Sequence, residues 1–182
     1  MRDILRKIFN KLFPQQDTLS LLIERGLVVG KNFSMQNEVI IDPNHCWHIT
    51  IGDNVTLAPR VYILAHDAST KRSLNYTRIG KVKIGDNVFI GASSTVLPGV
   101  IIGNNVIVGA GSIVVSDIPD NSIVVGNPAK VIDTYDNYMK KRKDEMSAFP
   151  CFGEEYTIRK NVSSEMQNEM NEKMTAKFGY LV

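Results

Sequence analysis

Aliphatic side chains recur at every sixth position along most of the chain. The longest series comprises Ile84, Ile90, Val96, Ile102, Val108 and Val114, and the same spacing holds at Val29, Met35 and Ile41 and at Ile51, Leu57 and Ile63. A period of six fits neither the 3.6-residue helical period nor the alternation of a long strand, but it fits short strands joined by corners. Glycine and asparagine, which tolerate the positive φ of a tight corner, cluster between the aliphatic positions. The pattern therefore predicts twelve hexapeptides that coil into stacked turns of parallel strands around aliphatic columns.

Two insertions interrupt this repeat. After Ile41 the repeat resumes at Ile51, which leaves four extra residues around 44–50. After Ile63 it resumes at Ile84, which leaves fifteen. Both insertions follow the third hexapeptide of a coil, so we expect them to leave the same edge, one coil apart, and all three histidines lie there: His45, His48 and His66. Because aliphatic side chains fill the inside of such a coil, a pocket has to come from the insertions or from a second subunit.

The segments on either side of the repeat predict short helices. Residues 1–13 place their apolar side chains on one helical face, which predicts an amphipathic helix packed on the body or on a sister subunit, with peripheral membrane contact as the alternative. After Pro128, residues 131–147 are predicted to be helical, and a second helix is predicted from Ser164, where Ser164 and Gln167 form a capping box. We therefore divide the chain into an N-terminal helical segment at 1–28, the repeat at 29–133 with a loop at about 64–83, and a C-terminal helical extension at 134–182.

Composition excludes several classes of protein. The 182 residues carry 21 basic and 19 acidic side chains, a net charge of +2, which offers no general attraction for nucleic acid. No apolar stretch approaches the roughly 18 residues that cross a bilayer, and the N-terminus lacks the apolar region of a secretory signal, so we expect a cytoplasmic protein. The two cysteines, Cys46 and Cys151, are too few for a disulfide framework and are expected to be free thiols.

Two longer segments carry a more specific pattern, IGDNVTLAPRVYILAHD from Ile51 and IGDNVFIGASSTVLPGVIIGNNVIVGAGSIVVSDIPDNSIVVGNPAKVI from Ile84. The first ends where an inserted loop opens with a histidine, and the second closes on DIPxNxxxxGNPAK. Residues 29–133 thereby resemble the hexapeptide acyltransferases of the maltose and galactoside O-acetyltransferase group, and the C-terminal extension resembles that of bacterial surface-polysaccharide O-acetyltransferases. The resemblance implies an all-β fold, a left-handed parallel β-helix of about four coils with a protruding loop. Its left hand comes from the resemblance alone, because periodicity does not reveal handedness.

The resemblance also implies an activity. The family transfers an acetyl group from acetyl-CoA to a sugar hydroxyl, in a homotrimer whose sites lie between subunits, and it requires no metal. His66 matches the catalytic histidine of the family. Imidazole, with an unperturbed pKa of about 6.5, can take the hydroxyl proton near neutral pH, so that the oxygen attacks the thioester directly. The analogy places a backbone N–H near Ala92 against the oxyanion that forms.

Further residues are nominated for the two substrates. The positions that match the acetyl-CoA contacts of the family are Phe89, Ala92, Ala110, Ser116 and Lys130. Stacking brings His45 one coil from His66, so we expect His45 to line the acceptor pocket. The other candidates for acceptor contacts are Asn37, Asp42 and Asp67, of which Asp67 could also orient the imidazole ring. Ser116 replaces a basic residue of the family and Asp133 stands in place of an arginine, so Lys140–Lys143 are the alternative phosphate contacts.

Three alternatives stay open. A zinc hydratase on the same scaffold could use His45, His48 and His66, although the second loop histidine typical of such enzymes is missing. An N-acetyltransferase that acts on an amino sugar or another amine would use the same base chemistry. The third alternative is a purely structural trimer without catalysis, and the presence of His66 at the mouth of the loop argues against it.

Overall fold

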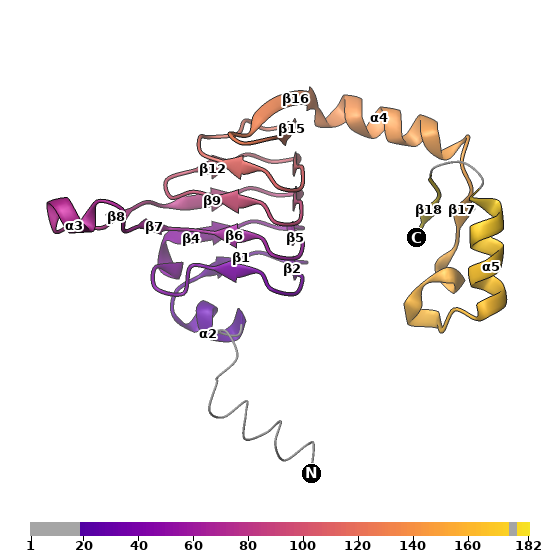
Figure 1. The fold of residues 1–182 in the computed structure, drawn as a ribbon, viewed down its shortest axis with the longest axis horizontal. Helices are drawn as coiled ribbons and strands as arrows, with labels where there is room; N and C mark the ends of the chain where they lie inside the picture. The colour runs from indigo at the N-terminus through magenta and orange to yellow at the C-terminus, as the bar shows by residue number, and fades with distance from the viewer. Residues whose placement is uncertain (1–18, 175–177) are drawn as a thin grey trace, which may run out of the picture. The chain divides into compact units, whose positions relative to one another are not determined.

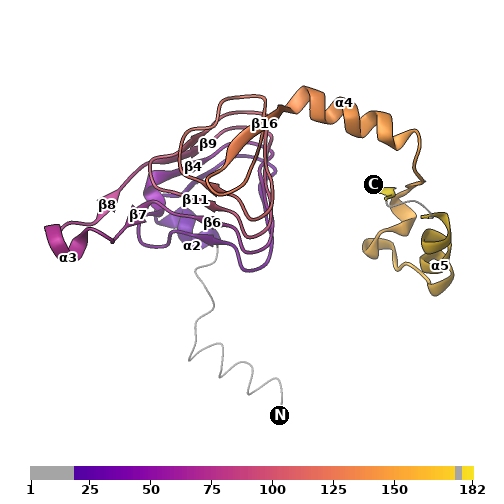
Figure 2. The ribbon, with the colours of Figure 1, turned by 45° about the horizontal axis from the view of Figure 1, so that its top comes forward.

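A computed structural model of the chain describes residues 19–174 and 178–182. The chain forms two compact units, Met1–Tyr135 and Asp136–Val182. The first unit is a coil whose strands run along three sides of a triangular prism (Figures 1 and 2). The predicted all-β fold, a left-handed parallel β-helix, is confirmed.

Three parallel sheets form the sides of the prism. The first sheet contains β1 (Val28–Val29), β4 (Ile49–Ile51), β9 (Val82–Ile84) and β12 (Ile101–Ile102). The second contains β2 (Ser34–Met35), β5 (Thr56–Leu57), β10 (Val88–Ile90), β13 (Val106–Val108) and β15 (Ser122–Val125). The third contains β3 (Ile40–Ile41), β6 (Tyr62–Ile63), β11 (Thr95–Val96) and β14 (Ile113–Val114). Each coil takes one strand from each sheet, which makes the four coils that the period of six predicts.

The register of the sheets stacks the repeated aliphatic residues on one another. Ile51, Ile84 and Ile102 are aligned in the first sheet, and Ile63 and Val96 are aligned in the third. These side chains are 0–1% exposed, so each column is sealed inside the prism. The interior is therefore packed with aliphatic groups and offers no room for a ligand.

Asparagines line the edge between the first and second sheets. Their φ angles lie between 53° and 56°, and the members of this ladder are Asn32, Asn54, Asn87 and Asn105. Each side-chain amide donates to the next one, at 2.9, 3.0 and 3.1 Å. Glycine precedes them because the coils nearly touch there: a Cβ on Gly85 would lie 2.6 Å from Asn104 Oδ1. The clustering of glycine and asparagine thus has a physical cause, a tight left-handed corner.

The top of the prism differs from the prediction. Ile118 bridges to Ile102 and β15 continues the second sheet, so the coil goes beyond four turns. Residues 131–134 were predicted to be helical, but they belong to β16 (Lys130–Thr134), which pairs antiparallel with β15. The helix α4 (Tyr135–Met146) begins only after this strand.

At the other end, α2 (Leu19–Glu24) covers the first coil, with Leu22 and Leu27 buried against the aliphatic core. The amphipathic helix predicted for residues 1–13 lies outside the described residues. The four-residue insertion folds into the 3₁₀ helix η1 (Cys46–His48). The longer one forms an arm of β7 (His66–Asp67), α3 (Lys71–Leu74) and β8 (Arg78–Ile79), which projects from the prism (Figure 1).

The second unit contains most of α4, followed by short elements. These are β17 (Cys151–Phe152), η2 (Glu154–Tyr156), η3 (Ile158–Lys160), α5 (Ser164–Lys173) and β18 (Tyr180–Leu181). The N-cap of α5 is Ser163, whose hydroxyl accepts a hydrogen bond from the Met166 N–H, so the capping box predicted at Ser164 and Gln167 is wrong by one residue. Throughout residues 19–174 and 178–182, each helix is too short or too polar to cross a bilayer.

Candidate active site

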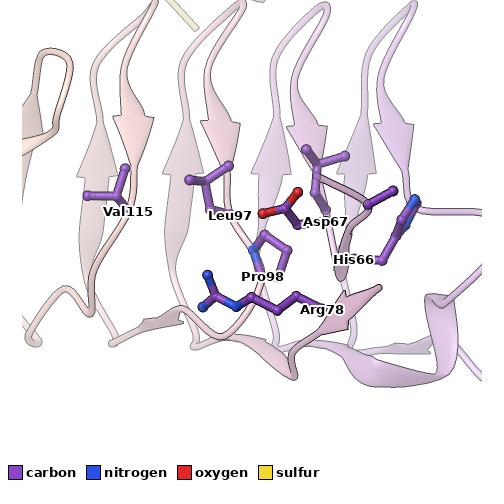
Figure 3. A pocket seen from close by; sticks show the side chains of 8 residues that line it. His66, Asp67, Arg78, Leu97, Pro98 and Val115 are labelled. Carbon is purple, nitrogen blue, oxygen red and sulfur yellow. The ribbon is translucent and has the colours of Figure 1, made fainter. Parts of the chain in front are cut away.

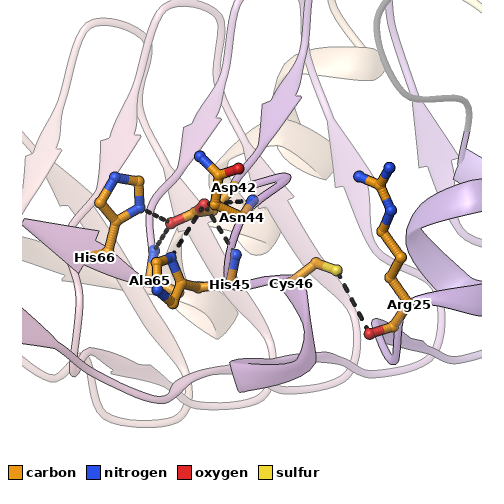
Figure 4. A network of polar contacts seen from close by, with 7 residues as sticks. All are labelled: Arg25, Asp42, Asn44, His45, Cys46, Ala65 and His66. Carbon is orange, nitrogen blue, oxygen red and sulfur yellow. Dashed lines mark hydrogen bonds and ion pairs between the residues drawn. The ribbon is translucent and has the colours of Figure 1, made fainter.

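His66 begins the arm where the chain leaves the third sheet, and Asp42 leaves the same sheet one coil earlier. The register places Ile41 beside Ile63, and the Asp42 N–H donates to the Ile63 carbonyl. Both side chains therefore emerge at one edge of the prism. His66 Nδ1 lies 2.5 Å from Asp42 Oδ2 (Figure 4).

The Asp42 carboxylate is held from several sides. Its side chain has no exposed surface, and Oδ2 also accepts the N–H of Ala65 at 3.0 Å. Oδ1 accepts the N–H groups of Asn44 and His45 at 3.0 and 3.2 Å. Burial raises the pKa of Asp42, but the hydrogen bonds from His66 and from the backbone of Ala65 and Asn44 outweigh it, so the pKa is lowered overall. Asp42 is therefore ionised at neutral pH.

An ionised carboxylate fixes the tautomer of the ring beside it. A carboxylate can only accept, so in the neutral form of the ring the hydrogen lies on His66 Nδ1 and Nε2 keeps its lone pair. From the sequence, Asp42 is expected to contact the acceptor, and Asp67 is the candidate for orienting the ring. In the structure Asp42 orients the ring, whereas the Asp67 carboxylate accepts the Ser69 N–H at 2.9 Å inside the arm. Hydrogen bonds from Ser69 also lower the pKa of Asp67.

A pocket of about 480 Å³ opens beside His66. Its floor is an apolar ladder, Leu64, Leu97 and Val115, in which each residue directly follows a strand of the third sheet on three successive coils (Figure 3). Arg78, which the sequence analysis did not nominate, reaches the rim because β8 pairs it with Asp67. The site thus combines a proton acceptor, an apolar floor and a charged rim.

The residues nominated for acetyl-CoA do not gather at this edge of the chain. Ala92 and Ala110 lie on the corner that joins the second sheet to the third, and so does Asn37. Phe89 is 44% exposed on β10 and Lys130 is exposed on β16. Of the five, only Ser116 follows the third sheet, beyond Val115. Within one chain, four of the five nominated donor contacts therefore lie away from the edge that carries His66.

Three potential metal ligands meet at the site. Donor atoms of Asp42, His45 and His66 lie within 4.8 Å of one another, and His45 Nδ1 is buried, without a hydrogen-bond partner in the described residues, 3.9 Å from Asp42 Oδ1. Two imidazoles and a carboxylate suit zinc. Both Asp42 oxygens, however, already accept hydrogen bonds, and the His48 ring stands 6.3 Å from that of His45. The geometry favours an Asp–His pair over a zinc centre.

Comparison with known proteins shows which family of proteins this chain is similar to. Residues 81–116 match the family described as bacterial transferase hexapeptide (six repeats). A putative acetyltransferase of Bacillus subtilis (strain 168), YvoF, is 40% identical over 115 residues, which cover 63% of this chain and 64% of that protein.

Two solved structures extend this comparison. A maltose O-acetyltransferase from Clostridium difficile 630 is 34% identical, with 70% of this chain and 83% of that chain covered and a TM-score of 0.53. A hexapeptide-repeat acetyltransferase from Vibrio cholerae O1 biovar eltor, complexed with acetyl coenzyme A, is 28% identical with 59% of each chain covered and a TM-score of 0.53. The chain spans less than two thirds of the Bacillus and Vibrio proteins. It belongs to the hexapeptide-repeat transferase family, as the resemblance of its repeats predicts.

Proposed function

We propose that the chain is an acetyltransferase that moves the acetyl group of acetyl-CoA onto a sugar hydroxyl. The observation that carries this proposal is the His66 ring, oriented by the buried Asp42 at the mouth of an apolar pocket. The maltose O-acetyltransferase and the acetyl coenzyme A complex among its structural relatives support both substrates. The C-terminal resemblance favours a surface polysaccharide or its precursor as the acceptor, modified in the cytoplasm.

The geometry suggests a direct reaction. His66 Nε2 takes the hydroxyl proton while the oxygen attacks the thioester carbonyl. The tetrahedral intermediate collapses, the C–S bond breaks, and the imidazolium returns its proton to the departing thiolate. Asp42 stabilises the imidazolium and keeps the ring in place. Cys46 is fully buried, so its thiol is not placed to form an acyl-enzyme.

The donor fits the apolar ladder. Coils are spaced about 4.8 Å apart, so Leu64, Leu97 and Val115 line roughly 10 Å of surface along the prism. A thin pantetheine arm can lie there with its thioester at His66. The corner that carries Ala92 and Ala110 completes the donor site when it comes from a neighbouring copy, which makes the homotrimer part of the proposal. In this proposal an imidazole activates the hydroxyl, and no metal takes part in the reaction.

A thiol-release assay with acetyl-CoA tests this function against sugars, nucleotide sugars, polysaccharide fragments and amines. His66→Ala should lower kcat at least about 100-fold while trimer assembly and CoA binding persist. Lys71→Ala, on the same arm but away from the pocket, is the matched control. Turnover with amines alone would assign the chain to the N-acetyltransferases, and full activity of His66→Ala would refute the mechanism.

A further inference from the structure

Four aromatic rings form a cluster at the edge that carries His66, and His45 is the member that contacts the other three. Ring centroids are 4.8 Å apart between His66 and His45, 5.5 Å between His45 and Trp47, and 5.7 Å between Trp47 and His48. All four rings come from the two insertions. Trp47 is the single tryptophan of the chain, and 53% of it is exposed. A half-exposed tryptophan that is linked to the proposed base through the ring of His45 indicates a binding surface.

Trp47 is held in this position by its own backbone. The His48 N–H donates to the His45 carbonyl at 3.0 Å, which closes the turn of η1. Cys46, with no exposed surface, anchors the turn with Sγ 3.8 Å from the Arg25 carbonyl (Figure 4). Gly26 makes room beneath, since a Cβ there would lie 2.9 Å from Trp47 Cβ. The exposed ring is therefore presented by a fixed backbone.

His66 divides the edge into two different surfaces. The apolar ladder runs from His66 over the second, third and fourth coils. The ring cluster lies on the other side, on the insertion that joins the first coil to the second. Acetyl transfer needs the thioester and the acceptor hydroxyl to meet at His66 Nε2 at the same time. With the donor on the ladder, the acceptor approaches over the ring cluster.

We propose that Trp47 is the platform on which a pyranose ring of the acceptor stacks, a proposal that rests on the acetyl transfer proposed above. A pyranose has a face of C–H groups, which an aromatic ring covers, and a rim of hydroxyls, which need polar partners. His45 stands beside the platform with 26% of its side chain exposed. Its Nδ1 is buried, so the exposed part is the remainder of the ring. A flat aromatic face flanked by imidazoles suits a sugar better than a simple amine.

Intrinsic fluorescence reports on this surface alone, because the chain has one tryptophan. The full-length protein, without acetyl-CoA, is titrated with the methyl glycosides of glucose, galactose, N-acetylglucosamine and N-acetylgalactosamine. We expect a saturable change in emission with at least one sugar, and protection by that sugar against acrylamide quenching. No saturable change with any of the four would overturn the proposal. So would an emission that acrylamide cannot quench because a second copy covers Trp47.

Kinetics separate a platform from a merely structural residue. Trp47→Ala should raise the KM of the acceptor about tenfold and leave the KM of acetyl-CoA within about twofold, whereas Trp47→Phe should retain most of the affinity. Tyr76→Ala, which removes an aromatic ring that is 78% exposed on the arm and does not line the pocket, should change neither constant. An unchanged acceptor KM in active Trp47→Ala refutes the platform alone. A wild-type protein that transfers no acetyl group refutes the proposed function, and the fluorescence titration still decides on Trp47.

Discussion

At the scale of single residues, Asp42 decides which nitrogen of His66 can accept a proton. An amide at position 42 can offer an N–H to Nδ1, which moves the ring hydrogen to Nε2 and removes the lone pair that the substrate needs. Asp42→Asn should therefore lower kcat by about 10²- to 10⁴-fold and leave the KM of acetyl-CoA nearly unchanged. Steady-state kinetics measure both constants. A kcat within threefold of wild type would show that the tautomer does not depend on Asp42.

The same carboxylate makes stability depend on pH. Folding lowers the pKa of Asp42, so its contribution to the free energy of unfolding is complete above the ordinary aspartate pKa of about 3.9 and is lost as the pH falls through the lowered value. Wild type should exceed Asp42→Asn in stability by more at pH 7 than at pH 3. Urea denaturation at a fixed protein concentration measures the difference. An equal difference at both pH values would mean that the charge of Asp42 contributes nothing.

Sequence patterns place His66 and Asp42 near one edge but do not reveal the contact between their side chains, and the reason is geometric. His66 opens an insertion, which the repeat itself exposes. Asp42 is 24 residues away, and its contact depends on the register between two coils and on how each chain turns out of the sheet. Arg78 reaches the pocket because it pairs with Asp67 between β7 and β8, and the sequence of the loop does not predict this pairing. Such contacts follow from tertiary placement, so no local pattern carries them.

At the scale of elements, the asparagine ladder can be tested at Asn87. Alanine there has to adopt φ near 55° and loses two amide hydrogen bonds, to Asn54 and Asn105. We expect Asn87→Ala to reduce the free energy of unfolding by about 2 kcal/mol. Asn87→Gly relieves the conformational cost but not the lost bonds, so it should cost about 1 kcal/mol. Denaturant unfolding compares them, and equal losses would place the whole effect in the side-chain bonds.

The sequence predicts the coils, but it does not predict the strand β16 that pairs with β15 at the end of the second sheet. Stacked coils need only a repeated aliphatic position and a corner residue, and both are visible in the sequence at Ile84 and Asn87. The strand β16 satisfies a different requirement, because β15 would otherwise leave its backbone N–H and C=O groups unpaired at the end of the sheet. Val131 and Ile132 are 52% and 61% exposed. Because neither side chain is buried, this segment lacks the alternation of apolar and polar residues by which a strand is recognised. A helix was the reasonable local prediction, and the open sheet edge overrides it.

At the scale of the whole molecule, the filled interior of the prism means that substrates can bind only on its outer surface. Its core is filled with aliphatic side chains, and Ala92 and Ala110 lie on a different corner from His66. We propose that one ligand touches both corners because the His66 edge of one copy faces the Ala110 corner of the next, as head-to-tail packing in a closed ring allows. The proposed site then needs two copies of the chain.

Mixed trimers test this arrangement. His66→Ala removes the base, and Ala110→Trp blocks the facing corner, so each variant alone should be inactive. In a trimer that contains both variants, one of the three junctions pairs an intact His66 edge with an intact Ala110 corner, and about one third of wild-type activity should return. Trimers co-expressed with two different tags and purified on both are assayed by thiol release.

The control pairs two defects on one edge. His66 and Asp42 act from the same copy, separated by a single hydrogen bond, so trimers of His66→Ala with Asp42→Asn contain no intact edge and should gain nothing. Recovered activity in the first mixture and none in the second places the reaction at the junction between copies. No recovery in the first mixture would put the whole site in one chain, and a fully active Ala110→Trp homotrimer would remove that corner from the donor site.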